Sequence, residues 1–283
     1  MSRPTHATMT PSSFEFAHRL PRVSARLAAA LLMAIAAVGM RSSDAGAQTN
    51  ETATSVPLPP NAAKVPFSVG EKLEYEVRFG SMKVGNGSME VQNIQDVRGR
   101  PSWHATFRYS GSMLMLKVND SHETWFDVET LSSRRFYQNI DNPGYDRTRR
   151  YEIFPERGMF KEGDKPEEPT PQNPLDDASF LYFVRTLPLE VGKTYTFQRY
   201  FKAQGNPVTI RVLRKETVRV PAGQFNTVVL QPTFRSKGLF SEGGKAEVYI
   251  TDDASRLMVQ LKSKLSIGSI NLYLKSHSAG TDK

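Results

Sequence analysis

The residues best suited to binding chemistry are arginines and aromatic residues gathered between positions 134 and 151. Arg134, Arg135, Phe136 and Tyr137 precede a turn at 141–144, and Arg147, Arg149, Arg150 and Tyr151 follow it. If the turn is centred between Asn142 and Pro143, Arg135 lies opposite Arg150, and directly opposed like charges destabilise a hairpin. Either Asp146 and Glu152 compensate, or an anion such as a lipid phosphate or a membrane surface binds there. A solvated basic face is the third interpretation of this pattern.

A second candidate is the run at residues 112–118, which carries apolar side chains on both faces of an expected strand. Met113 and Met115 lie in this run, and flexible thioether side chains suit the irregular wall of an acyl-chain cavity. A central strand covered by core on one side and by a helix on the other has the same composition. The sequence leaves both interpretations open.

Residues for catalysis, metal binding or cofactor binding are scarce. The chain has no cysteine, and after residue 47 its histidines are His104, His122 and His277, without the spacing of a helical zinc pair. Neither a glycine-rich phosphate loop nor a G-x-S-x-G nucleophile motif occurs. The adjacent carboxylates at 176–177 and 252–253 fit a helix cap and an Asx turn. We therefore predict a non-enzymatic protein with no catalytic residue, no metal site and no cofactor.

The elements that must position the candidate residues are strands. Alternation of period two begins with Leu73, Tyr75 and Val77 and recurs toward the C-terminus, which is typical of strands with one buried face. Further strands are expected at 87–97, 103–109, 121–128, 134–140, 145–154, 194–202, 208–220, 225–234, 246–251 and 257–267. Turn residues separate them at 85–87, 98–101, 141–144, 221–223 and 242–244. The pattern predicts an all-β, mainly antiparallel fold, either a large curved sheet or a partly open β-barrel.

One helix is expected after a polar, proline-rich loop at residues 161–174. Asp176 suits its N-cap, and Pro188 ends it. An apolar stripe at helical spacing is formed by Phe180, Phe183, Val184 and Leu187. We expect this amphipathic helix to lie on the open end or concave face of the sheet, where Phe180 and Phe183 would help to line a ligand cavity.

The N-terminal region has the features of an export signal. Arginines precede the uncharged run at residues 27–40, and an Ala-Gly-Ala site suited to a signal peptidase follows at 45–47. As a helix, this run would be only ~21 Å long, too short to cross the hydrocarbon core of a membrane. The predicted organisation is a signal peptide at 1–47, a flexible tether at 48–66, one β-rich domain at 67–278 and a disordered tail at 279–283. Without cysteine to carry a lipid anchor, we expect a periplasmic protein with no transmembrane span in the mature chain. Part of the net charge of +8 belongs to the predicted signal peptide.

Several sequence segments resemble those of a family of exported bacterial proteins known only as domain of unknown function 3108. They are FSVGEKLEY at 67–75, DDASFLYFVRTL at 176–187, VPAGQFNT at 220–227 and AEVYITDDASR at 246–256. The resemblance implies an all-β envelope protein without an established activity. Its outline is similar to bacterial lipoprotein-carrier folds, which hold acyl chains.

These features favour a protein that binds a lipid-like or other amphiphilic anionic ligand in the concavity of a curved sheet. Arg135, Arg147, Arg149 and Arg150 would meet the anionic head. The alternative is a structural or assembly factor of the envelope that binds a protein partner through sheet edges or the loop at 161–174. A filled core beneath the helix would favour this alternative, and an open groove would favour ligand binding. Nucleic acid is not an expected partner of an exported protein.

Overall fold

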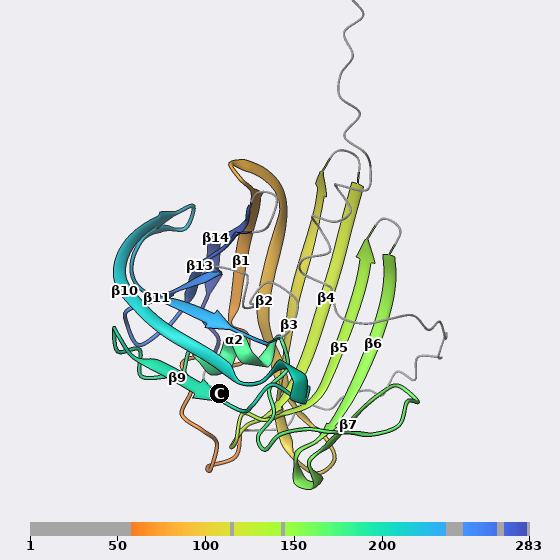
Figure 1. Cartoon of the computed structure of the whole chain (residues 1–283). Helices are drawn as coiled ribbons and strands as arrows, with labels where there is room; N and C mark the ends of the chain where they lie inside the picture. The colour runs from red at the N-terminus through yellow and green to blue at the C-terminus, as the bar shows by residue number, and fades with distance from the viewer. Residues whose placement is uncertain (1–57, 114–115, 143–144, 236–245, 265–268, 282–283) are drawn as a thin grey trace, which may run out of the picture.

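The computed structural model describes residues 58–113, 116–142, 145–235, 246–264 and 269–281. In this part of the chain, the strands form one 14-stranded antiparallel sheet that curls around a short helix, α2 (Figure 1). The sheet order is β8-β7-β6-β5-β4-β3-β2-β1-β14-β13-β12-β11-β10-β9. Neighbours in sequence pair except β8 and β9, which are the two ends of the sheet, and the one pairing of strands distant in sequence is β1 with β14. The predicted fold class is confirmed.

The elements have the following bounds. The strands are β1 (Lys72–Phe79), β2 (Met82–Asp96), β3 (Pro101–Met113), β4 (Leu116–Asp127), β5 (Ser133–Asn142), β6 (Tyr145–Phe154), β7 (Met159–Glu162), β8 (Glu168–Pro169), β9 (Thr194–Phe197), β10 (Val208–Val220), β11 (Gly223–Thr233), β12 (Glu247–Thr251), β13 (Met258–Lys264) and β14 (Ser269–Ser278). The helices are α2 (Ser179–Val184) and two short 3-10 helices, η2 (Pro155–Arg157) and η3 (Ala203–Gly205). Strands β6 and β10 occupy the residues predicted for them.

The turn predicted at residues 85–87 is wrong. These residues lie inside β2, and the connection from β1 is made at Gly80, whose φ is 60°. Gly85 is required by close strand packing instead, because a Cβ atom on it would lie 2.4 Å from the carbonyl oxygen of Ser110 on β3. A glycine needed for a close backbone approach has the same sequence signature as a turn glycine.

Two further segments differ from the expectation. The predicted loop at 161–174 is partly strand, because its first residues belong to β7, which pairs with β6, and β8 pairs with β7. Strand β14 was not predicted, although Ile270, Leu272 and Leu274 alternate and are buried. It pairs with β1 and so joins the two halves of the sheet.

The two ends of the sheet meet at the segment that leads into α2. Leu175 forms a parallel bridge with Tyr200, which follows β9, and the Phe201 N–H donates to the Leu175 carbonyl at 3.0 Å. Nearby, the Thr170 hydroxyl donates to the Phe201 carbonyl at 2.8 Å. The segment after β9 is thereby held against the residues that precede α2.

Helix α2 is shorter and more enclosed than the predicted helix. Asp176 Oδ1 accepts hydrogen bonds from the N–H groups of Ala178 (2.8 Å) and Ser179 (2.9 Å), which is the role of a capping carboxylate. Phe180 and Phe183 of the expected apolar stripe are buried, but Tyr182 is buried as well. The curved sheet and its loops therefore contact the helix from more than one side.

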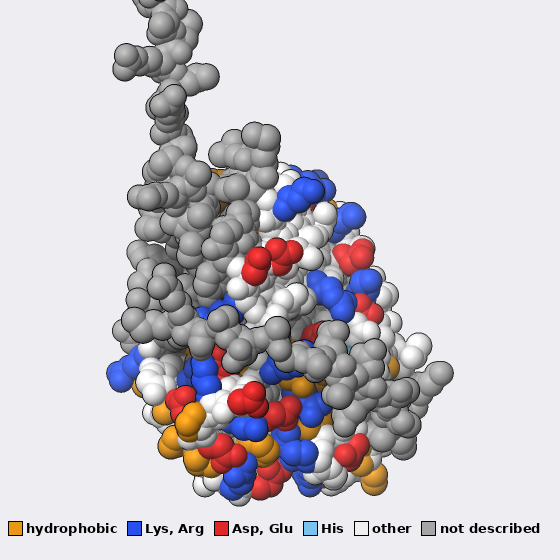
Figure 2. Space-filling model, turned by 90° about the vertical axis from the view of Figure 1, so that its right-hand side faces the viewer, with side chains coloured by type: hydrophobic (Ala, Val, Ile, Leu, Met, Phe, Trp, Pro, Cys, Tyr) orange, Lys and Arg blue, Asp and Glu red, His pale blue; other side chains and the backbone are white. Residues whose placement is uncertain are grey.

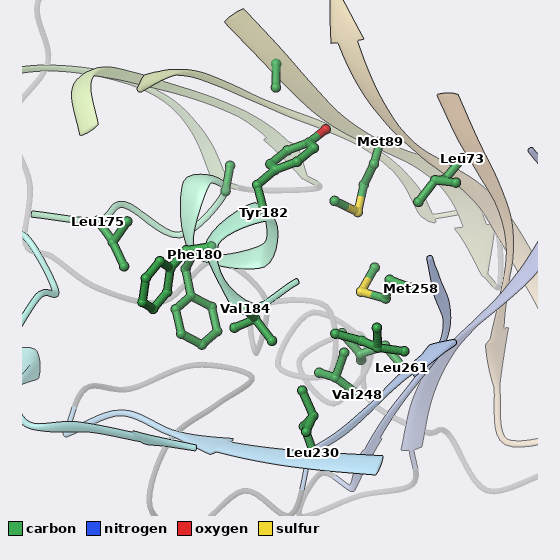
Figure 3. Packing of buried hydrophobic residues seen from close by; sticks show 14 of the residues in the cluster. Leu73, Met89, Leu175, Phe180, Tyr182, Val184, Leu230, Val248, Met258 and Leu261 are labelled. Carbon is green, nitrogen blue, oxygen red and sulfur yellow. The ribbon is translucent and has the colours of Figure 1, made fainter. Parts of the chain in front are cut away.

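The space beneath α2 is filled by a hydrophobic core (Figure 3). Tyr182 and Val184 of the helix lie near side chains from two regions of the sheet, which are Leu73, Met89, Leu230, Val248, Met258 and Leu261. Each of these residues is at most 3% exposed. The Tyr75 hydroxyl also donates to the Met258 carbonyl at 2.8 Å across this core. This part of the concave face is packed protein interior.

The boundaries of the domain are described in part. The predicted signal peptide lies outside the described residues, as does the first half of the predicted tether. In the rest of the tether, the Ala63 N–H donates to the Val128 carbonyl at 2.8 Å. In the predicted tail, the Thr281 N–H donates to the Val69 carbonyl at 2.9 Å. Within the described ranges, no helix combines the length and apolar character needed to cross a membrane.

Candidate functional site

The register of β5 and β6 divides the candidate arginines between the two faces of the sheet. Arg135 pairs with Glu152, Tyr137 with Arg150, Gln138 with Arg149 and Ile140 with Arg147. The predicted opposition of Arg135 and Arg150 is therefore wrong, because the hairpin turn lies one residue further along the chain than assumed. Since side chains alternate along a strand, Arg147 and Arg149 share the concave face with buried Tyr151, whereas Arg135 and Arg150 face outward.

The outward arginines are occupied by their neighbours on the convex face. Arg135 Nε lies 2.7 Å from Glu152 Oε1, and its guanidinium carbon lies 5.6 Å from the Trp125 ring centroid. The guanidinium of Arg150 lies over the Tyr137 ring at 5.7 Å. These contacts give the like charges of the hairpin local compensation, so Arg135 and Arg150 do not join a site in the concavity.

The face of the molecule in Figure 2 carries charged side chains of both signs. Basic and acidic side chains are interspersed over its described surface, and they do not gather into a patch of one sign (Figure 2). In the hairpin itself, Arg135 pairs with Glu152, and Arg147 lies 3.6 Å from Glu162, so acidic side chains accompany these arginines.

The concave face changes character along β4, β5 and β6. Beside α2, a row across these strands consists of Thr124, Phe136 and Tyr151, all at most 1% exposed. The next row away from the helix is His122, Gln138 and Arg149, and the one after it is Asp120, Ile140 and Arg147. Along each of these strands, polar and charged side chains thus replace core residues only two positions away along the chain, on the same face of the sheet. We refer to these two rows as the polar rows.

Residues from other elements reach the edge of the polar rows. Asp177, just before α2, accepts hydrogen bonds from the Tyr200 hydroxyl at 3.1 Å and from Gln138 Nε2 at 3.4 Å. Lys202 Nζ donates to the Tyr151 hydroxyl at 3.0 Å and lies 4.6 Å from that ring's centroid. Because the two ends of the sheet meet here, Asp177, Tyr200 and Lys202 lie next to the concave face of β5 and β6.

The electrostatics of this group follow from its burial. Burial lowers the pKa of the His122 imidazole below its usual value, and the charge of Asp177 opposes that shift only in part. Burial also lowers the pKa of the Lys202 ammonium, against the effect of Asp177 and with the help of Arg149. For Tyr151, burial raises the phenol pKa, although nearby Arg149 opposes the change. At neutral pH, His122 is uncharged and Tyr151 keeps its hydroxyl proton.

The predicted aromatic ligands on the helix have structural partners. Phe180 contacts the Phe234 ring edge-on, with centroids 4.7 Å apart, and Phe183 contacts Phe197 in the same way at 5.2 Å. Both rings line a narrow crevice that has no room for a water molecule. Phe180 and Phe183 thus pack against the β9–β11 side, away from the contacts of the polar rows.

The structure does not describe the side chains of the two candidate methionines. Met113 is the last residue of β3, where only its backbone is described, and Met115 lies outside the described residues. No group of three or more His, Asp or Glu side chains within the described ranges comes together to hold a metal ion. His104 stacks on Trp125 at 4.4 Å between centroids, on the convex face and so on the opposite side of the sheet from the polar rows.

A buried ion pair is the strongest electrostatic feature that sequence reasoning missed. The Arg185 guanidinium, whose side chain is 0% exposed, binds both carboxylate oxygens of Glu71 at 2.6 and 2.8 Å. It also donates to the carbonyls of Pro66 and Ser255 at 2.9 and 3.1 Å. Both residues lie in sequence segments that resemble the family, at 67–75 and 176–187. No local pattern shows, however, that residues 114 positions apart will pair.

The polar rows and Lys202 were also missed as a unit. The alternation along β4 would place Asp120 and His122 on the same face as buried Thr124, which is the only signal available in the sequence. Lys202 could not be assigned, because its place depends on the contact between the two ends of the sheet. Of the predicted ligand residues, Arg147 and Arg149 alone are placed on the polar rows by the described structure.

Solved structures resemble this chain in fold. A β-barrel-like protein of domain of unknown function DUF1849 from Brucella abortus has a TM-score of 0.50 and 12% identity, covering 76% of this chain and 99% of that chain. A candidate lipoprotein from Parabacteroides distasonis has a TM-score of 0.33 and 8% identity, covering 76% and 98%. A candidate exported protein from Bacteroides fragilis has a TM-score of 0.33 and 11% identity, covering 77% and 99%. At these identities, the likeness concerns the fold alone.

Sequence comparison assigns the family. No curated protein matches the chain. The model of the family described as "Protein of unknown function (DUF3108)" matches residues 74–275, a range that includes α2, the polar rows, Lys202 and most of β1 and β14. The chain therefore belongs to the DUF3108 family.

Proposed function

We propose that this protein is an exported, periplasmic binding protein, not an enzyme, and that it holds an amphiphilic anionic ligand on the concave face of its sheet. The observation that carries the proposal is the change from the fully buried row at Thr124, Phe136 and Tyr151, two of which belong to the hydrophobic core, to the polar rows. An amphiphile requires such a boundary, because its chain is stabilised by apolar surface and its head by polar side chains.

The charges on the concave face suit an anionic head. Arg147 and Arg149 extend inward from neighbouring positions of one face of β6, with side chains 14% and 4% exposed. Arginine binds carboxylate and phosphate through several donors in a fixed plane, and such hydrogen bonds gain strength where water is excluded. Phe136 and Tyr151, which belong to the packed core, lie directly beside these arginines, so the apolar part of the concave face adjoins its charged part.

The proposal is tested by native mass spectrometry combined with lipid extraction on protein purified from the cell envelope. Arg149→Gln removes an inward charge, and Arg150→Gln is the matched control, since it removes the neighbouring charge on the outward face. We expect an amphiphile of defined mass with the natural protein and with Arg150→Gln, and a strongly reduced amount with Arg149→Gln. Recovery of only empty protein from all three preparations would contradict the proposal.

The packed core beneath α2 favours a second function, a structural or assembly factor that binds a protein of the envelope. The terminal strands β8 and β9 each have one edge without a partner strand among the described residues, and an exposed edge can pair with another chain. In-cell crosslinking from a residue of β9, such as Thr196, would capture one defined envelope protein under this function. If the protein binds an amphiphile instead, crosslinking at Thr196 gives no single product.

A further inference from the structure

We propose that Arg149, Lys202 and Tyr151 form an oxyanion subsite, which holds the carboxylate or phosphate group of the bound amphiphile. This inference rests on the proposed function and assigns the position and chemistry of the ligand head. The site is built from two parts of the chain, since Arg149 and Tyr151 come from β6 and Lys202 comes from the segment between β9 and η3.

Three hydrogen-bond donors converge at this place. Lys202 Nζ donates to the Tyr151 hydroxyl oxygen at 3.0 Å, and the Arg149 side chain also interacts with this hydroxyl. Because the Tyr151 oxygen accepts from Lys202, its own hydrogen is left to donate to another group. No hydrogen bond donated by the Tyr151 hydroxyl is formed with another described residue. An oxyanion, which only accepts, complements a phenol, an ammonium and a guanidinium.

Carboxylates near this place are divided among several partners, and Glu162 and Asp177 are two of them. Glu162 Oε1 lies 3.8 Å from Arg149 Nε and 3.6 Å from Arg147, while its other oxygen lies 3.1 Å from Lys165. Asp177 accepts from the Tyr200 hydroxyl and from Gln138. Glu162 is thus shared among three cations, and an added anion between Arg149 and Lys202 would relieve the repulsion between those two.

The surroundings of the subsite fit the start of an apolar chain. The Tyr151 ring lies against Phe136 at 6.0 Å and against Phe201 at 5.1 Å between centroids. Lys202 Nζ lies over both Tyr151 and Phe201, which partly removes it from water. Burial accordingly lowers the pKa of Lys202, and a bound anion would raise that pKa again.

The inference is tested by calorimetric titration at pH 7 with single-chain amphiphiles, below the concentrations at which they form micelles. The probes are dodecanoate, dodecyl phosphate, uncharged dodecanol and inorganic phosphate. We expect one or both anionic amphiphiles to bind at least about tenfold more tightly than dodecanol, as charge-assisted hydrogen bonds require. Lys202→Met should reduce this preference to less than about threefold while leaving the dodecanol affinity unchanged. Lys193→Met, at an exposed position, is the matched control.

The outcomes separate the subsite from the proposed function. Equal binding of dodecanol and the anions by the natural protein would overturn the subsite, while amphiphile binding itself would stand. Absence of binding by every amphiphile would overturn the proposed function together with the subsite. Binding of inorganic phosphate as tightly as dodecyl phosphate, with loss in Lys202→Met, would support the oxyanion subsite and identify free phosphate as its source. Arg149→Gln provides a second variant, for which the same loss of preference is expected.

Discussion

Two buried cationic places in this protein differ in how their charges are compensated. At the first, the two terminal nitrogens of Arg185 donate to both oxygens of Glu71 and to two backbone carbonyls at 2.6–3.1 Å, and its buried Nε has no hydrogen-bond partner among the described residues. At the second, Arg149 and Lys202 converge on the hydroxyl of Tyr151, and the Glu162 carboxylate, 3.8 Å from Arg149 Nε, is shared with Arg147 and Lys165.

The difference indicates different roles. A buried arginine with a two-oxygen carboxylate partner ties together the segments that supply its acceptors, here the residues before β1, the end of α2 and the turn after β12. Two cations at one neutral hydroxyl contribute little to folding and are better suited to a ligand. The comparison predicts that substitutions at the two places act in different directions on stability.

The largest expected effect is at the ion pair. Arg185→Met leaves the Glu71 carboxylate buried without its partner, which should lower the free energy of unfolding by about 3–5 kcal/mol. Chemical denaturation with a fluorescence readout measures the change. The double variant Glu71→Leu/Arg185→Met removes both charges and should recover most of the loss. A single variant that loses less than about 1 kcal/mol would show that the pair does not hold these segments together.

The pH dependence of stability tests the burial of the polar rows. Because burial lowers the pKa of His122 below its usual 6.5, the unfolded chain binds its proton more readily than the folded protein. The contribution of this residue is present above pH 6.5 and is lost as the pH falls through its lower folded pKa. Denaturation between pH 5 and 7.5 should show a smaller rise in stability with pH for His122→Gln than for the natural protein. Parallel curves would mean that His122 is solvated.

A smaller effect of opposite sign is expected at the proposed subsite. Without ligand, Lys202→Met replaces a partly buried cation by an apolar side chain that lies on the rings of Tyr151 and Phe201. Thermal and chemical denaturation should therefore show unchanged stability or a gain of up to about 1 kcal/mol. A loss of about 3 kcal/mol, comparable with that of Arg185→Met, would make Lys202 a structural residue and remove the contrast.

The smallest effect is expected on the convex face. Arg150→Gln removes a partly exposed cation over Tyr137, and stability should change by less than about 0.5 kcal/mol. The melting temperature, measured beside that of Arg149→Gln, provides the check. A loss of more than about 1 kcal/mol for Arg150→Gln would contradict the placement of Arg150 on the outward face.

The sequence predicted the class of fold because alternation is a local property. Strands such as β6 and β10, and the capping role of Asp176, depend on residues within a few positions of each other. Register was harder to predict, since moving the β5–β6 turn by one residue exchanged the partners of Arg135 and Arg150. Pairing of Glu71 with Arg185, and of Lys202 with Tyr151, depends on how distant segments meet, and no local spacing encodes such contacts.

The central claim is that the inward cations of the polar rows and Lys202 hold the head of an amphiphile. A crystal structure of the protein with dodecyl phosphate tests it most directly. The account predicts phosphate oxygens within hydrogen-bond distance of Arg149, Lys202 and the Tyr151 hydroxyl, with the chain against apolar residues of the concave face. Density for the head at Arg135 and Arg150 on the convex face, or a structure in which Arg149 and Lys202 contact only protein groups, would contradict it.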